Sequence, residues 1–384
     1  MKDLIEKLLH IIRATREPEN KPLTKVLLDL VNYSSRLGLS PGEYFTYGLH
    51  GRKATTDYCL GYLPNALHFQ DHLATLNNTA TRVLNDKLLF KTLMNETGVA
   101  IPRTIGYAGP ATREDLSFER ITETSIREVL ATHKLDSFLV KPATGKHGKG
   151  IHIVSYSPDS LSSFRVGEQC MDASEFFNFL GAHCCSLKSD YILFEYVVLP
   201  PESLKKISPS ASPNVRIITL MLPDGEVVVT SASIRLGRSQ SVTSNAASGG
   251  LTGRIDRQTG TITGCRTTGY MLGELVHDHP DTLAPITGVL VPGWNDVLST
   301  CTTAAAAVPD VRSIGWDVLI GEGRPVIVEG NERWGIIGEQ LLGEGYLSDR
   351  NRCLLKGYGL RFAEHTMPPP SLRKLRLALF GSSS

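Results

Sequence analysis

The sequence predicts an α+β protein in which a largely helical N-terminal part precedes β-rich lobes. The first 85 residues combine helical periodicity with polar loops, whereas β-type runs with turn signals recur from residue 138 onward. The chain has 384 residues. At about 150 residues per domain, this length corresponds to two or three packed lobes.

The composition excludes several classes of protein. Forty basic and 39 acidic side chains leave a formal charge of +1, which argues against a nucleic-acid binder that releases phosphate counterions. No apolar run approaches the roughly 18–20 residues that span a bilayer, so no membrane partner is expected. Seven cysteines without a CxxC pair indicate reduced thiols. We therefore expect a cytoplasmic protein.

Helical signals begin with residues 4–12, whose apolar spacing indicates an amphipathic helix and not a signal peptide. Residues 25–37 have the same periodicity and end at a Gly-Leu-Ser-Pro-Gly stretch. Asn85 or Asp86 can cap a further helix that Gly98 terminates. Residues 286–308 indicate another helix. Residues 1–85 are assigned to the N-terminal domain.

The remaining segments are mostly β-type, apart from residues 108–137, which are polar and indicate helix. Leu-Pro-Asp-Gly at residues 222–225 joins the runs 215–221 and 226–235 and is a hairpin signal. Residues 238–264 are rich in Gly, Ser and Thr and predict a long loop with a short hairpin. The expected strands are 101–107, 138–141, 151–155, 191–198, 215–221, 226–235, 311–320 and 325–329.

The last two strands carry a pair of carboxylates. Asp317 and Glu329 each lie six residues from Gly323. If the turn is centred on Gly323, the two side chains face each other with Cβ atoms roughly 5 Å apart. Asn331 points the same way because side chains alternate along a strand. The opposite face is expected to be core, formed by Val318, Ile320, Val326 and Val328.

Two carboxylates on one face repel each other unless a cation lies between them. Hard oxygen ligands with an amide suit Mg²⁺, with Mn²⁺ as the alternative, and such ions are often shared with substrate phosphates. The competing interpretation is that Asp317 and Glu329 are ordinary solvated strand residues.

A glycine-rich segment lies between two β-type runs, from Lys141 to Ile151, and contains Gly145, Gly148 and Gly150. It joins strand to strand and is therefore neither a Walker loop nor a Rossmann turn, since both of those open a helix. Backbone N–H groups and nearby lysines in such a loop favour phosphate binding. A purely structural hairpin is the alternative.

The order of these features resembles the ATP-grasp superfamily. Residues 38–49, 208–219 and 245–251 resemble its sugar-transfer-associated branch, which is related to the alpha-L-glutamate ligases. The resemblance covers roughly residues 35–345. The features that carry it are Lys87, Lys141, the glycine loop, the strand 192–198, Arg216, Arg235, Asp317, Glu329 and Asn331.

The resemblance implies that a nucleotide is held between two β-rich lobes. It divides the chain into a middle lobe with a glycine-rich lid (86–195), a C-terminal lobe with the metal site (196–365) and a tail (366–384). It implies nucleotide contacts for Lys87, Lys141, Gly148, Gly150, Glu195, Tyr196, Val198 and Glu202, metal ligation for Asp317, Glu329 and Asn331, and catalytic roles for Arg235, Arg216 and Lys149.

The implied activity is an ATP-dependent carboxylate–amine ligase that forms an amide through an acyl phosphate. ATP and Mg²⁺ would be its cofactors. Its partners would be a small-molecule, glycan or peptide carboxylate and an amine, and a homodimer is left open. The alternatives are an ATP-grasp kinase that phosphorylates a small metabolite and a nucleotide-binding protein without turnover.

Overall fold

The computed structural model describes residues 12, 15–77, 82–114, 116–144, 150–160, 162–187, 189–209, 211–238, 249–267 and 273–362. Most of the predicted N-terminal helix at residues 4–12 lies outside this range, as do Gly148, Lys149 and the tail at 366–384.

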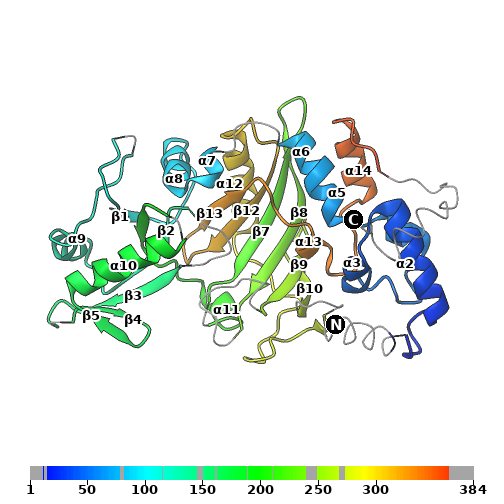
Figure 1. Ribbon diagram of the computed structural model, residues 1–384, viewed down its shortest axis with the longest axis horizontal. Helices are drawn as coiled ribbons and strands as arrows, with labels where there is room; N and C mark the ends of the chain where they lie inside the picture. The colour runs from blue at the N-terminus through cyan, green and yellow to red at the C-terminus, as the bar shows by residue number, and fades with distance from the viewer. Residues whose placement is uncertain are drawn as a thin grey trace, which may run out of the picture.

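A six-stranded antiparallel sheet forms one end of the molecule (Figure 1). Its strand order is β1-β6-β2-β3-β4-β5. The strands are β1 (Thr104–Ala108), β2 (Ser137–Pro142), β3 (His152–Tyr156), β4 (Phe164–Val166), β5 (Gln169–Met171) and β6 (Ile192–Glu195). Helices α9 (Ile126–His133) and α10 (Ala173–Leu187) pack on it. Phe138, Phe164, Phe176 and Phe194 form an aromatic core there.

A seven-stranded antiparallel sheet forms the centre, with strand order β11-β10-β9-β8-β7-β12-β13. The strands are β7 (Asn214–Met221), β8 (Val227–Leu236), β9 (Leu251–Ile255), β10 (Ile262–Thr267), β11 (Leu275–Val276), β12 (Ser313–Ile320) and β13 (Pro325–Asn331). Helix α12 (Trp294–Ala306) covers one face of it with apolar side chains. Apolar side chains of α6 (Leu73–Leu76) and α14 (Asp349–Lys356) pack on part of the other face, and α13 (Ile337–Gln340) contacts β8. The rest of this face is polar.

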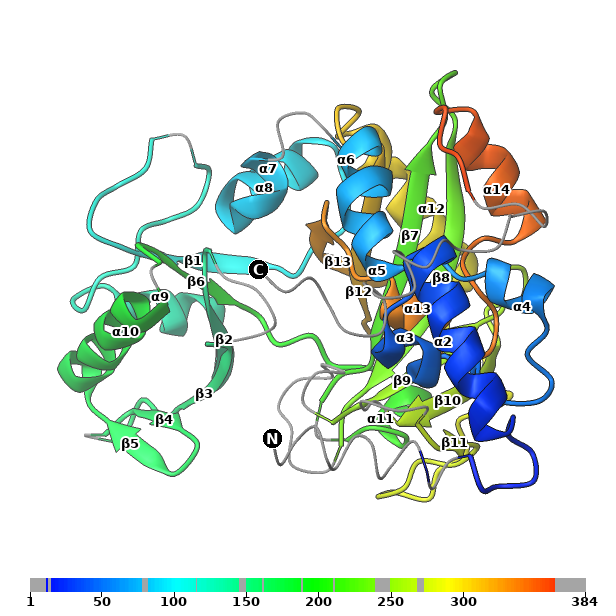
Figure 2. The same ribbon diagram turned by 45° about the vertical axis from the view of Figure 1, so that its right-hand side comes forward.

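The first helices of the chain lie at the opposite end from the six-stranded sheet, whereas the later α6 and α7 (Arg82–Asn85) pack on the seven-stranded sheet (Figure 2). The core of the first helices is rich in aromatic residues, including Tyr44, Phe45, Tyr47 and Tyr62. The helices are α2 (Leu23–Leu37), α3 (Pro41–Thr46), α4 (Thr56–Leu60), α5 (Asn65–Leu67), η1 (His68–His72), α6 and α7 (Arg82–Asn85). The short α11 (Glu202–Lys205) follows the six-stranded sheet.

Helix α8 (Lys87–Glu96) connects the two sheets. Its Phe90 and Met94 belong to the core of the seven-stranded sheet, whereas Leu88 packs with Tyr107 and Leu193 of the six-stranded sheet. The predicted cap is confirmed, since the Asp86 carboxylate accepts from the Leu88 N–H at 2.9 Å. Gly98 follows the helix with φ +70°, a conformation that favours glycine.

Several sequence-based boundaries are wrong. The helix expected at 286–308 begins only at Trp294, because Gly293 immediately before it has φ +64°. Within the polar segment 108–137, helix α9 covers only Ile126–His133. The strand expected to reach Val198 ends at Glu195, after which the Tyr196 N–H donates to the Arg103 carbonyl at 2.9 Å. By contrast, the 238–264 hairpin is present as β9 and β10.

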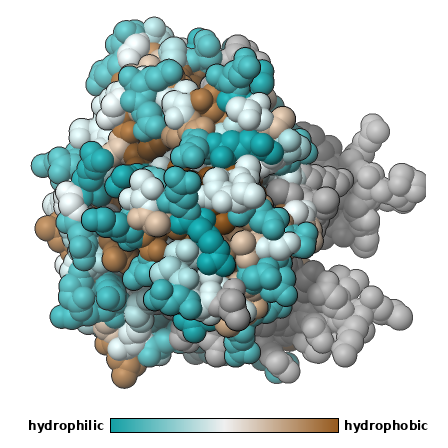
Figure 3. All heavy atoms as spheres, turned by 90° about the vertical axis from the view of Figure 1, so that its left-hand side faces the viewer, coloured by the Kyte–Doolittle hydropathy of each residue, from teal (hydrophilic) through white to brown (hydrophobic). Residues whose placement is uncertain are grey.

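None of the helices within the described residues is both long and apolar enough to cross a lipid bilayer. Figure 3 shows the face at the end that carries the six-stranded sheet. Hydrophilic residues cover most of its described surface, and the hydrophobic ones lie in small separate patches.

Gly345→Ala is expected to lower the unfolding free energy by roughly 1–3 kcal/mol, the scale of overpacking. A Cβ atom at this position would overlap the backbone carbonyl of Gly61, whose oxygen accepts from the Leu347 N–H at 2.8 Å. Thermal and urea unfolding measure the effect. The control is Gly181→Ala on α10, where a Cβ meets nothing within 4 Å. Equal destabilisation by both variants would contradict the close approach at Gly345.

Candidate functional site

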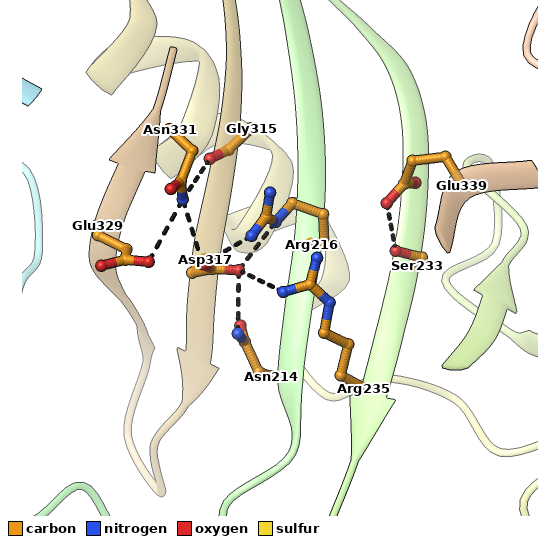
Figure 4. Close-up of polar contacts among 9 residues, drawn as sticks. All are labelled: Asn214, Arg216, Ser233, Arg235, Gly315, Asp317, Glu329, Asn331 and Glu339. Carbon is orange, nitrogen blue, oxygen red and sulfur yellow. Dashed lines mark hydrogen bonds and ion pairs between the residues drawn. The ribbon is translucent and has the colours of Figure 1, made fainter. Parts of the chain in front are cut away.

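The polar face of the seven-stranded sheet brings the predicted metal ligands together (Figure 4). The register pairs Asp317 with Glu329 and Gly315 with Asn331. The predicted pairing of Asp317 with Glu329 is therefore confirmed, although the turn is not centred on Gly323, since Ile320 pairs with Pro325. Asp317 is 5% exposed, so the alternative of an ordinary solvated strand residue does not hold for it.

The predicted core face of β13 is wrong between the turn and Glu329, where Val326 pairs with Leu319 and so lies on the other face. Val318 pairs with Ile327, and the register shifts between Asp317 and Val318. Val328 is therefore the extra residue of a β-bulge. As a result Ile327 joins the core with Val318, while Val328 stays half-buried outside it.

Asp317 is held by cations and amides from the neighbouring strands. Arg216 donates to both carboxylate oxygens, from Nε to Oδ1 and from Nη2 to Oδ2, each at 2.8 Å. Asn214 Nδ2 donates to Oδ1 at 2.9 Å, and Arg235 lies 3.7 Å from the same oxygen. Burial opposes ionisation of Asp317, but Arg216 and Arg235 outweigh it and hold the pKa of Asp317 well below its usual range.

Glu329 has a different electrostatic environment on the same face. Burial, and then the charge of Asp317, raise the pKa of Glu329, and Lys87 only partly opposes this shift. The Asn331 amide nitrogen lies 3.3 Å from Asp317 Oδ2 and 3.4 Å from Glu329 Oε1. A cation between the two carboxylates would stabilise the ionised form of both.

This donor set suits a small hard cation. Among the described residues, no three His, Cys, Asp or Glu side chains cluster as a metal site, so the candidate ligands are two carboxylates and one amide. A half-turn of the Asn331 amide would direct its oxygen, in place of nitrogen, toward both carboxylates. Two carboxylates and an amide oxygen leave further positions for phosphate oxygens, as Mg²⁺ sites commonly do.

A second charged cluster lies on the six-stranded sheet around Glu195, which is 2% exposed. Its Oε1 lies 3.0 Å from Lys141 Nζ and 2.8 Å from Lys91 Nζ. These ammonium groups outweigh the effect of burial and lower the pKa of Glu195. Burial lowers the pKa of Lys91 to about 8.

Sequence reasoning missed Lys91. Its signal is the helical spacing, because Lys91 lies four residues after Lys87 and so shares a face of α8. Lys91 Nζ also donates to the Pro102 carbonyl at 2.8 Å. Lys91 therefore ties α8 to the six-stranded sheet.

Lys87 lies between the two charged clusters. Burial lowers its pKa, and its electrostatic neighbours include Glu329, Lys141 and Glu195. Its backbone N–H donates to the Ala143 carbonyl at 3.2 Å. The structure thus brings Lys87 close to both Lys141 and Glu329 of the other sheet.

The segment after Glu195 connects the two sheets. The Val198 carbonyl accepts from Ser212 Oγ at 3.1 Å, and Tyr196 Oη lies 2.8 Å from His133 Nδ1. Glu202 is exposed in the first turn of α11. Of the predicted lid, Gly150 is described, with φ +81°.

Arg235 lies on β8 beside a further carboxylate that the sequence did not reveal. Glu339 of α13 accepts from Ser231 Oγ at 2.6 Å and from Ser233 Oγ at 2.8 Å. The charge of Arg216 and then burial lower the pKa of Arg235, while Asp317 and Glu339 oppose the shift. Arg235 is half-buried and faces the region of Asp317 (Figure 4).

Two sheets joined through a lysine-bearing helix, with a carboxylate–amide set on the last hairpin, define an ATP-grasp protein. The model of the family described as sugar-transfer associated ATP-grasp matches residues 70–353. This match covers most of the chain, and the protein belongs to that family and has the ATP-grasp fold.

Solved structures with a similar fold include D-cycloserine synthetase DcsG, at 14% identity and a TM-score of 0.40, over 87% of this chain and 94% of that one. Biotin carboxylase from Campylobacter jejuni has 12% identity and a TM-score of 0.41 over 73% of this chain. D-alanine–D-alanine ligase from Bacillus anthracis has 12% identity and a TM-score of 0.38 over 72% of this chain and 66% of that one. The chain spans only 47% of the biotin carboxylase. No curated protein matches the sequence.

Arg216→Met is expected to lower the unfolding free energy by about 3–5 kcal/mol, because it leaves the buried Asp317 charge without its bidentate partner. Denaturant unfolding followed by circular dichroism measures this loss. The control is Arg238→Met, which removes the more exposed pair with Asp281 and should cost about 0–1 kcal/mol. Similar losses in the two variants would show that the Asp317 charge is compensated elsewhere.

Proposed function

We propose that the protein is an ATP-dependent carboxylate–amine ligase that forms an amide through an acyl phosphate and releases ADP and phosphate. The observation that carries the proposal is the set of buried Asp317 and half-buried Glu329 and Asn331 with Arg216 and Arg235 beside it. The domain boundaries expected at 85/86, 195/196 and 365/366 are part of the same proposal.

The candidate metal ligands are Asp317, Glu329 and Asn331, which would hold Mg²⁺ or Mn²⁺. When bound, the ion would neutralise charge on the phosphates of ATP. The raised pKa of Glu329 supports this assignment, because a group that resists ionisation alone gains most from a cation.

The nucleotide would lie between the two sheets. Lys87 and Lys141 would contact its α- and β-phosphates, and Lys149 with Gly148 and Gly150 would close on the β/γ end. Tyr196 and Val198 would contact adenine, Glu195 would lie beside it, and Glu202 would reach the ribose. The ion pair of Glu195 with Lys141 supports a positioning role for Glu195, since its carboxylate holds the lysine in place.

In the proposed reaction a substrate carboxylate oxygen attacks the γ-phosphorus and ADP leaves. The amine nitrogen then attacks the acyl carbon, loses a proton, and phosphate departs with the C–O bond electrons. Phosphoryl transfer depends mainly on positioning and positive charge. Arg235 would stabilise the transferred phosphoryl group, and Arg216 would hold Asp317 in place. Closure of the lid would exclude water from the acyl phosphate.

Glu329→Gln is expected to reduce Mg²⁺-dependent ADP release by about 100-fold or more, the scale of losing one aligned charge-stabilising group. Its melting temperature should stay near that of the wild type, because the fold already disfavours the Glu329 charge. Glu322→Gln, in the exposed turn of the same hairpin, is the matched control. Wild-type turnover in Glu329→Gln would mean that the metal site is misplaced.

The reaction type is tested by measuring ADP release with acids alone and with acid–amine pairs, and by mass spectrometry of the products. A ligase should form an amide and require both substrates for full turnover. Rapid amine-independent turnover to a stable phosphorylated product would identify a kinase instead. ATP binding without turnover across the panel would favour a non-catalytic nucleotide-binding protein.

A further inference from the structure

The polar face of the seven-stranded sheet continues beyond Arg235. Arg235 on β8 pairs in register with Thr252 on β9, which pairs with Arg266 on β10. Directly paired residues point to the same face. At about 4.8 Å per strand, the Cα atoms of Arg235 and Arg266 lie roughly 10 Å apart.

Arg266 differs from the other arginines of this face in its charge pairing. Arg216 binds Asp317, Arg235 lies near the same carboxylate, and Arg254 pairs with Glu344. Within the described part of the chain, Arg266 has no carboxylate partner; its Nη1 donates to the Gly273 carbonyl at 2.7 Å.

The Arg266 guanidinium is also incompletely hydrogen-bonded. Its Nε is buried and, among the described residues, has no acceptor. Burial lowers the pKa of Arg266, and Tyr58 and Tyr62 of the N-terminal part oppose the shift. A buried donor without a partner costs free energy, and the planar guanidinium matches a carboxylate or phosphate in two parallel hydrogen bonds.

Thr252 lies between Arg235 and Arg266 in the row and, like Arg266, has a buried polar atom without a hydrogen-bond partner among the described residues. Its side chain is buried, and its Oγ1 has no hydrogen-bond partner among the described residues. One cross-strand row thus contains a cation beside the candidate reaction centre, an unpartnered hydroxyl, and a second cation without a counter-charge.

We propose that Arg266 binds a second anionic group of the acid substrate, a carboxylate or a phosphate, while the reacting carboxylate lies at Arg235. The substrate class is then a dianionic acid whose charged groups are separated by a chain of several atoms. This inference rests on the proposed function for the reacting carboxylate of the acid substrate. It adds that the opposite end of the same substrate carries a second anionic group.

The test is equilibrium binding, which does not depend on turnover. Linear dicarboxylates from succinate to sebacate, the monocarboxylates of equal length and the corresponding ω-phosphonocarboxylates are titrated calorimetrically, with and without a non-hydrolysable ATP analogue and Mg²⁺. At one chain length the dianions should bind at least about tenfold more tightly than the monoanion, the scale of a charge-assisted hydrogen bond. The phosphono series distinguishes phosphate from carboxylate at Arg266.

Arg266→Gln should abolish this preference without weakening the monoanion, and Arg266→Lys should restore part of it. The matched control is Arg257→Gln in the β9–β10 turn. Arg257 is also half-buried with a pKa lowered by burial, and it donates to the Val229 carbonyl at 3.1 Å. The Arg257→Gln variant should keep the wild-type preference for dianions over monoanions.

The inference is overturned if the wild type shows no dianion preference, if Arg266→Gln retains it, or if Arg257→Gln loses it equally. A failure of the ligase proposal is detected in a different experiment, the turnover assay, in which no amide would form. Arg266-dependent binding of dianions without amide formation would thus uphold this site and reject only the reaction.

Discussion

The buried ion pair between Asp317 and Arg216 is the interaction on which the candidate site depends. It joins β12 to β7, next to the edge strand β13 of the larger sheet, and binds both carboxylate oxygens of Asp317. A charge in this position is tolerated only because its partner is aligned and hydrogen-bonded. With Asp317 held ionised, the neighbouring Glu329 resists ionisation, and this contrast makes the pair a suitable cation site.

The alternation of side chains along the strands separates packing from chemistry. Residues such as Ile234 and Trp316 face α12 and form the core, while their neighbours Arg235 and Asp317 face the opposite side. On this face Arg216 and Arg254 each have a carboxylate partner, whereas Arg266, in the adjacent cross-strand row, has none among the described residues. On the other sheet, Glu195 brings two ammonium groups together in the same way.

Features encoded by local sequence were predictable. The Asp86 cap and the Gly98 stop define α8 because a helix end depends on only a few neighbouring residues. Asp317 and Glu329 pair as their distances to Gly323 predicted, but the turn alone does not produce this pair. The turn sets the register of Ile320 with Pro325 and Val318 with Ile327, and only the extra residue that follows brings Asp317 opposite Glu329. The bulge at Val328 was not predictable, because nothing in the local pattern marks an extra residue in a strand rich in valine.

The sequence by itself determined the order of elements, the hairpin that carries the carboxylates and the membership of the ATP-grasp class. The tertiary structure decided which charges meet. Lys91 reaches Glu195 from a helix about a hundred residues earlier in the chain, and Arg266 lies in one row with Arg235 only because β9 separates their strands. Such contacts depend on packing between distant segments, and the environment that shifts each pKa exists only once that packing has removed water.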